Sequence, residues 1–211
     1  MSNLKTLEQK PEPKITPSGH GNLPKYILGI LDMHEVPWKT WGTGTSRTIE
    51  DFCRSLQEER VAFRDWTQRP LIIDVHSAVV TVRYNDHGHW LELYEEYQVF
   101  KLTGQILKRK LNGIAETVKN NETVEETAVR CIAEELGFTE WAEYQLKPHP
   151  EKARETWEPM PSEKWPRIWA AYHRHMFDCQ ISERLFNPEG YVEHVDGTRE
   201  IHFKWKPVAT K

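Results

Sequence analysis

Residues 122–138 read ETVEETAVRCIAEELGF, and this stretch decides the fold. In a helix, side chains four positions apart lie on one face, so the apolar and the acidic residues separate. The apolar face, which we expect to be buried, consists of Val124, Ala128, Ile132 and Leu136. The acidic face consists of Glu122, Glu126, Arg130 and Glu134. Because Gly137 is a typical C-terminal stop, the stretch predicts one helix from about residue 122 to 136.

The acidic face has two interpretations. In the first, it is a solvated surface on which Glu126, Arg130 and Glu134 form four-spaced ion pairs, each contributing a few tenths of a kcal/mol. In the second, the adjacent Glu134 and Glu135 in the last turn approach a hard divalent cation. Mg²⁺ accepts one or two carboxylates together with waters and substrate phosphates. The second interpretation predicts an ion that bridges a diphosphate.

The same stretch resembles the Nudix box. The order of that motif is Gly, five residues, Glu, seven residues, Arg-Glu, an aliphatic residue, any residue, Glu-Glu, any residue, Gly and an aliphatic residue. The chain keeps seven of the nine specified positions: Glu122, Arg130, Ile132, Glu134, Glu135, Gly137 and Phe138. Two positions differ. Glu116 stands at the box glycine, with Gly113 three residues earlier, and Cys131 stands where the family has a glutamate.

The resemblance implies a Nudix-type hydrolase that cleaves a nucleoside diphosphate linked to another moiety and depends on Mg²⁺ or Mn²⁺. In the family, the glutamates matching Glu134 and Glu135 bind the metal, and the arginine matching Arg130 orients the carboxylates. We therefore expect Glu135, Glu134 and Arg130 to act in catalysis. Glu134, Glu135 and Glu116 are the expected metal ligands, Glu116 partly compensating for Cys131. A base from a downstream loop has four candidates: Glu151, Glu155, Glu158 and Glu163.

Cys131 leaves a second function open. A thiol is a soft ligand that matches a hard cation poorly, so the chain could be a catalytically inactive Nudix-like module that binds nucleotides or regulates a partner. A third hypothesis makes the acidic helix face a docking surface within a larger assembly, with the Pro-rich N-terminal segment as an adaptor. Nucleotide-dependent stabilisation without turnover is expected for the second hypothesis, and a stable protein partner for the third.

The segments on both sides of the helix have the β-branched residues and the alternation typical of strands. The expected strands cover residues 71–84, 90–101, 105–111, 167–179, 191–195 and 199–206. Short turns at residues 85–88 and at Asp196-Gly197 predict two hairpins. Residues 112–121 and 148–166 are expected to be loops. The pattern predicts an α+β fold, α/β/α sandwich-like, and the resemblance implies a Nudix-like mixed sheet with a central loop-helix box.

Four segments are expected along the chain. Residues 1–24 contain four prolines and few apolar positions, which predicts a disordered tail. Residues 25–70 form an N-terminal extension with a short helix at 48–59, where Thr48 is the expected N-cap. Residues 71–205 form the Nudix-like domain, and residues 206–211 a C-terminal tail.

Composition excludes several classes of protein. The net charge of −4 over 211 residues provides no field for DNA, and no apolar run reaches the roughly 18 residues of a membrane-spanning helix. The three widely spaced cysteines, Cys53, Cys131 and Cys179, predict free thiols and a cytoplasmic location. We expect a nucleotide-derived small molecule as substrate, neither stable DNA binding nor a membrane, and a homodimer as the candidate assembly.

Three weaker motifs favour structural roles. His173 and His175 alternate on an expected strand, where polar-face or hydrogen-bonded histidines are commoner than metal ligands. Residues 42–46, GTGTS, precede a helix without the spacing or lysine of a P-loop, which favours a capping loop over a phosphate cradle. Trp157, Trp165 and Trp169 could stack a base, although most tryptophans are expected in the core.

Overall fold

The computed structural model describes residues 24–43, 46–150, 152–195 and 197–208. The expected disordered tail therefore lies outside the described residues, apart from Pro24. The three α-helices are α1 (Lys25–Met33), α2 (Ile49–Gln57) and α3 (Val124–Leu136). The two short 3-10 helices are η1 (Trp38–Thr40) and η2 (Trp141–Glu143). The strands are β1 (Val61–Phe63), β2 (Ile72–Asp86), β3 (His89–Phe100), β4 (Gln105–Asn112), β5 (Ile114–Thr117), β6 (Tyr144–Pro148), β7 (Arg154–Thr156), β8 (Met160–Pro161), β9 (Trp169–Ile181), β10 (Tyr191–Val195) and β11 (Arg199–Pro207).

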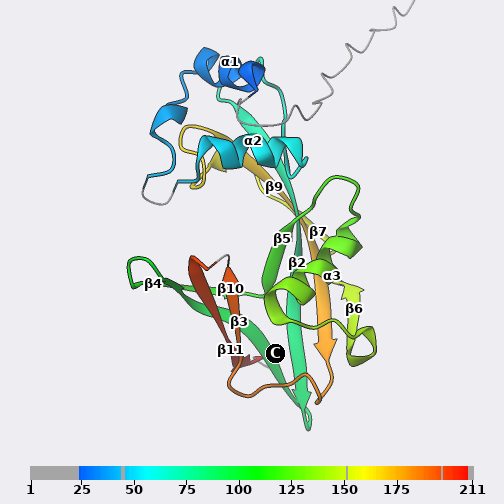
Figure 1. Ribbon diagram of the computed structural model, residues 1–211. Helices are drawn as coiled ribbons and strands as arrows, with labels where there is room; N and C mark the ends of the chain where they lie inside the picture. Colours follow the sequence, from blue (N-terminus) through cyan, green and yellow to red (C-terminus); the bar gives the residue numbers. More distant parts are fainter. Residues whose placement is uncertain (1–23, 44–45, 151, 196, 209–211) are drawn as a thin grey trace, which may run out of the picture.

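One mixed sheet contains all of these strands. Its main order is β10-β11-β3-β2-β9-β6, and β2 and β9 run parallel over twelve paired positions. The end of β2 pairs with β3, whereas its middle, Ser77–Val80, pairs with β5. β3 therefore diverges from β2 and pairs on its other side with β11, which in turn pairs with β10. Figure 1 shows that these three strands point away from β2 and β9. α3 contacts β2, β5 and β10, at the place where the sheet divides.

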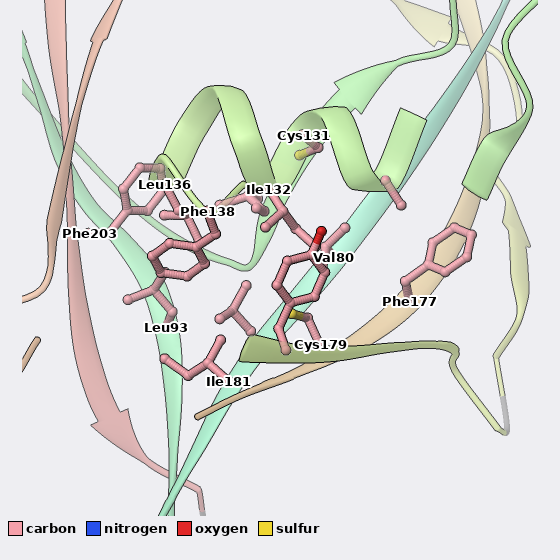
Figure 2. Close-up of a cluster of buried hydrophobic side chains, with 14 of the residues drawn as sticks. Val80, Leu93, Cys131, Ile132, Leu136, Phe138, Phe177, Cys179, Ile181 and Phe203 are labelled. Atoms are coloured by element: carbon pink, nitrogen blue, oxygen red, sulfur yellow. The ribbon is translucent and has the colours of Figure 1, made fainter. Parts of the chain in front are cut away.

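The larger core lies beneath α3. Ala128, Ile132 and Leu136 of the expected apolar face are buried there, whereas Val124 is only partly buried. Cys131 is also fully buried, so the helix turns this side chain inward rather than toward a surface site. Figure 2 shows Cys131 on α3 and Ile132 pointing toward the labelled side chains of the sheet. Packing of this face anchors α3 and fixes the direction in which its acidic residues point.

Both ends of α3 follow from the sequence. Thr123 caps the N-terminus by accepting from the Glu126 backbone N–H, and the Glu126 carboxylate accepts from the Thr123 N–H in return. Gly137 ends the helix in the left-handed region with a φ of 75°. The expected Glu126–Arg130 ion pair is wrong, because the capping box already holds the Glu126 carboxylate.

A second core joins the N-terminal segment to the far ends of β2 and β9. Phe52 of α2 packs edge-on against Trp41, Phe63 and Trp165, with ring centroids 5.4, 6.0 and 5.1 Å away. Burial of these large rings is the main favourable contribution at this end of the molecule. Trp165 is thereby a core residue, and α2 begins at its expected N-cap, Thr48.

The α+β class and both hairpins are confirmed. The interpretation of residues 112–121 as a loop is wrong in part, because residues 114–117 form β5 along the edge that β3 leaves open on β2. Gly113, with a φ of 73°, makes this pairing possible, since a Cβ there would lie 2.5 Å from the Val80 carbonyl oxygen. The expected loop at 148–166 contains the short strands β7 and β8.

Candidate active site

Arg130, in the middle of α3, ties the helix to the loop before it. Its Nε and one terminal nitrogen donate to the two carboxylate oxygens of Glu122 at 2.7 and 2.9 Å. The other terminal nitrogen donates to Glu134 at 3.0 Å and to Glu116 at 3.2 Å. A fifth bond runs to the Thr117 carbonyl oxygen at 2.9 Å. The guanidinium therefore organises three carboxylates and is itself fully engaged.

Glu122 is held in its ionised form. Besides Arg130, its carboxylate accepts from the Thr127 hydroxyl at 2.8 Å and from the Lys119 N–H at 3.2 Å. The Arg130 hydrogen bonds, helped by the Thr127 and Lys119 contacts, lower the pKa of Glu122 to about 2. Such a carboxylate fixes the loop before α3 and is poorly suited to exchange a proton near neutral pH.

The adjacent Glu134 and Glu135 point in different directions. Glu134 is about half exposed and lies between Arg130 and Lys119, with Nζ of Lys119 3.8 Å from its carboxylate. Glu135 turns inward and accepts from the Ala115 N–H and from the Cys131 S–H, both at 3.3 Å. Glu134 is thus compensated by cations, whereas the donors that contact Glu135 within the described ranges are weak and neutral.

Glu135 lies in a region of excess negative charge. Burial, followed by the nearby Glu193 carboxylate, raises its pKa to about 8, and Glu116 adds to the shift. Glu193 itself has a raised pKa because of burial, with Arg199 opposing the shift and Glu116 contributing to it. α3, β5 and β10 thus bring Glu135, Glu116 and Glu193 close to one another. Glu193 was missed from the sequence, since strand alternation alone does not show that β10 folds back beside α3.

Cys131 supplies a neutral hydrogen-bond donor where the Nudix box has a carboxylate. Burial, followed by the charge of Glu135, raises its pKa well above the usual range. The side chain is therefore a thiol that donates to Glu135. This position contributes no negative charge and no hard oxygen ligand.

The carboxylates around Glu135 suit a hard divalent cation in their chemistry. They are oxygen donors, and the raised pKa values of Glu135 and Glu193 indicate that negative charge is concentrated there. Within the part of the chain that the structure describes, no three His, Cys, Asp or Glu side chains are grouped to hold a metal ion. Mg²⁺ needs only one or two carboxylates when water and phosphate oxygens complete its shell, so Glu135 with Glu116 fits this ion.

Of the four downstream glutamates, the three that the structure describes lie beside other groups. Glu151 lies outside the described residues. Glu155 is in β7, opposite Arg174 of β9. The charge of Glu158 helps to raise the pKa of Arg64, and the charge of Glu163 helps to raise the pKa of Tyr172. Both glutamates therefore lie on the side of the second core.

The histidines form a separate polar row on β2 and β9. His173 lies 2.8 Å from Asp74 through Nε2, and its ring stacks on His76 with centroids 4.5 Å apart. His175 is also near His76, at 6.1 Å between centroids. Burial lowers the pKa of His76 and of His175, which keeps these rings neutral near pH 7. The hydrogen bond to Asp74 gives His173 a structural role, whereas Nε2 of His175 is buried without a hydrogen-bond partner among the described residues.

Two further motifs have local roles. Gly42 donates its N–H to the Ser46 hydroxyl, closing a turn before α2, while residues 44–45 lie outside the described residues. Trp157 carries the Arg174 guanidinium 3.9 Å above its ring, and Trp169 is partly exposed. No described helix is both long and apolar enough to cross a membrane.

No family model and no curated protein matches the chain. A structure described as a NUDIX hydrolase from Listeria monocytogenes matches with a TM-score of 0.37 and 13% identity, covering 64% of this chain and 77% of that one. The Ap4A hydrolase of C. elegans matches with a TM-score of 0.34 and 16% identity, covering 63% and 79%. The NUDIX domain of Shewanella oneidensis NrtR, complexed with ADP ribose, matches with a TM-score of 0.33 and 10% identity, covering 64% and 73%. The chain is similar in fold to these proteins, and at TM-scores this low the likeness assigns it no activity.

Proposed function

We propose that this chain is a Nudix-type hydrolase that cleaves a nucleoside diphosphate linked to another moiety with the help of Mg²⁺ or Mn²⁺. The observation that carries the proposal is the partly buried Glu135 carboxylate, whose pKa is raised to about 8 next to Glu193 and Glu116. A group of neighbouring oxygen donors with excess negative charge is suited to a divalent cation. Its position at the end of the box-like helix is the one that the sequence resemblance implies.

Each charged residue of the site would have a distinct role in the reaction. Glu135 and Glu116 would hold the cation, which when bound polarises phosphoryl oxygens and lowers the pKa of a water molecule. Arg130 would act as a positioning residue, because it holds Glu116 and Glu134 through its second terminal nitrogen. Glu193 would accept a proton from the attacking water, since its raised pKa brings it closer to neutral pH.

The first experiment is hydrolysis of a panel of nucleotide sugars, dinucleoside polyphosphates and oxidised nucleotides with Mg²⁺ or Mn²⁺. Glu135→Gln should lower kcat/KM at least about 100-fold on any substrate that is cleaved, because the cation loses a charged ligand. The matched control is Glu125→Gln, an exposed residue of the same helix. Equal activity of Glu135→Gln and the wild-type protein would reject the proposal.

A second candidate is a nucleotide-binding module without turnover, which Cys131 favours. The thiol supplies no ligand, and Arg130 is fully engaged by the loop and helix carboxylates. This candidate predicts that nucleotides raise the melting temperature of the protein but are not cleaved. Cys131→Glu separates the two. A large gain of hydrolysis would indicate an inactive ancestral site, whereas turnover by the wild-type protein would exclude the module.

We also propose a reducing, cytoplasmic setting. Cys53, Cys131 and Cys179 are all free and buried, as expected of thiols that are never paired. Thiol titration of the unfolded protein isolated without reductant should find three free groups, and fewer would contradict this setting.

A further inference from the structure

A cavity of about 440 Å³ lies between α2 and the turn that joins β10 to β11. Figure 1 shows α2 above this end of the sheet. One wall comes from α2 and the residues around it, and the other from Phe100, Val195, Thr198 and Arg199. This volume is within the range of small-molecule sites, about 300–1,000 Å³. The cavity lies outside the carboxylate group at Glu135.

The side chains around the cavity carry an excess of positive charge. Its four arginines are Arg47, Arg54, Arg60 and Arg199, and its two acids are Asp51 and Glu58. Each acid is already paired, Asp51 with Arg54 at 3.4 Å and Glu58 with Arg60 at 2.6 Å. Among the described residues, Arg47 and Arg199 form no ion pair with a carboxylate, and Arg199 only donates to Gln98 at 3.4 Å. In a protein of net charge −4, this is a local concentration of cations.

Lys164 extends this positive region toward the carboxylates. Its carbonyl oxygen accepts from the Arg47 N–H at 2.8 Å. The side chain is accessible to solvent, yet surrounding protein atoms, followed by the charge of Arg47, lower its pKa to about 8. Because Glu116 acts on Lys164 and Arg199 acts on Glu193, the positive and negative regions adjoin each other.

We propose that the arginine-lined cavity binds phosphate groups of a multiply phosphorylated small molecule, in addition to the diphosphate cleaved beside Glu135. Guanidinium groups bind phosphate oxygens through paired hydrogen bonds, and two of these arginines are free to do so. The part of the proposal that concerns cleavage rests on the proposed function, whereas phosphate binding by the cavity does not. With phosphate binding in this cavity, the substrate class is a polyphosphate rather than a plain sugar diphosphate.

The shape of the site favours a small molecule over a nucleic acid. Proteins that bind single strands use a groove with several aromatic side chains on which successive bases stack. Phe100 is the one aromatic residue among the side chains that line this cavity in the described chain. The recess is therefore built to neutralise phosphates rather than to stack bases.

The test measures binding of inorganic tripolyphosphate to the full chain by isothermal titration calorimetry in EDTA, so that no metal site contributes. The wild-type protein should bind, and Arg47→Gln combined with Arg199→Gln should weaken binding at least about tenfold, because each lost charge-assisted bond removes a large share of affinity. Arg54→Gln, at an exposed position, should also weaken binding and serves if the double variant does not fold. The matched control is Arg184→Gln, an exposed arginine outside the cavity.

The outcomes separate this proposal from its alternatives. No binding by the wild-type protein, or an equal loss in Arg184→Gln, would overturn it, as would tighter binding of a single-stranded oligonucleotide at equal phosphate concentration. ATP titrated in parallel tells a nucleotide from a non-nucleotide ligand, and either preference supports the cavity. Glu135→Gln should abolish hydrolysis and keep tripolyphosphate binding. Glu135-dependent hydrolysis without tripolyphosphate binding would reject the cavity and leave the proposed function standing.

Discussion

The carboxylates on the two sides of α3 differ in how far their negative charge is compensated. On one side, Arg130 gathers Glu122 and Glu134 and satisfies them with hydrogen bonds, and it also contacts one oxygen of Glu116, whose charge acts on Glu135 as well. On the other, Glu135 is partly buried near Glu193, and among the described residues its hydrogen-bond donors are the Ala115 N–H and the Cys131 thiol. The first arrangement is a fully hydrogen-bonded link between α3 and the segment before it. The second leaves carboxylates with raised pKa values close together, a feature that is common at functional sites.

The difference gives the two sides opposite pH dependence. Glu122 has a pKa of about 2 in the folded protein against an ordinary 4.5, so its contribution to stability is present above pH 4.5 and is lost as the pH falls toward 2. Glu135 has a folded pKa of about 8 against the same 4.5, so the folded state holds its proton more tightly. The contribution of Glu135 to the free energy of unfolding is fully present below pH 4.5 and is lost as the pH rises through 8.

The largest expected effect is the alkaline loss of stability at Glu135. Between pH 4.5 and 8 the free energy of unfolding should fall by about 4 kcal/mol, since each unit of pKa difference is about 1.4 kcal/mol. Glu135→Gln should remove most of this slope, because the amide does not titrate. Urea denaturation at half-unit pH intervals measures both proteins.

A divalent cation sharpens this test. Mg²⁺ added at pH 8 should restore stability to the wild-type protein and leave Glu135→Gln unchanged, because binding to the folded state alone is stabilising. Parallel slopes for the two proteins would show that another group causes the alkaline loss, and the contrast between the two sides would fail.

The next effect in size concerns the opposite side. Arg130→Met should lower the free energy of unfolding by about 3 kcal/mol at pH 7, because three carboxylates and the Thr117 carbonyl oxygen lose their donor. Part of this loss should disappear at pH 4, where carboxylates no longer paired with Arg130 take up protons. Arg184→Met is the control, since that arginine is 68% exposed and its ion pairs should matter little. A loss that is equal at both pH values would show that Arg130 acts through packing.

The helix and the hairpins could be predicted because their signals are local. Thr123 and Gly137 mark the ends of α3, and strand alternation with short turns gives the two hairpins. β5 could not be predicted in this way. Its four residues are extended because β2 offers an open edge there, and that edge exists only after β3 has diverged. Non-local pairing of this kind leaves no trace in periodicity.

The candidate site was predictable in its helix and not in its surroundings. Residue spacing placed Arg130 beside Glu134, but the different directions of Glu134 and Glu135 depend on which helix face the core buries. Glu193 and Lys164 come from segments distant in sequence, and the folding of β10 and of the segment before β9 brings Glu193 near Glu135 and Lys164 near Glu116. The sequence could therefore name the charged helix, whereas the fold decides which charges are left uncompensated.

The smallest expected effect tests whether the two sides of α3 are independent. Thr123→Ala removes the N-cap that accepts from the Glu126 N–H and should lower the free energy of unfolding by about 1 kcal/mol at every pH. Thr123→Ser keeps the hydroxyl and should stay close to the wild-type value. Because Thr123 lies at the opposite end of the helix from Glu135, the alkaline slope of Thr123→Ala should match that of the wild-type protein in the same denaturation series. A flatter slope would mean that fraying of the first turn exposes Glu135 to water. In that case the hydrogen bonds of Arg130 and the Glu135 carboxylate would belong to one cooperative unit rather than two.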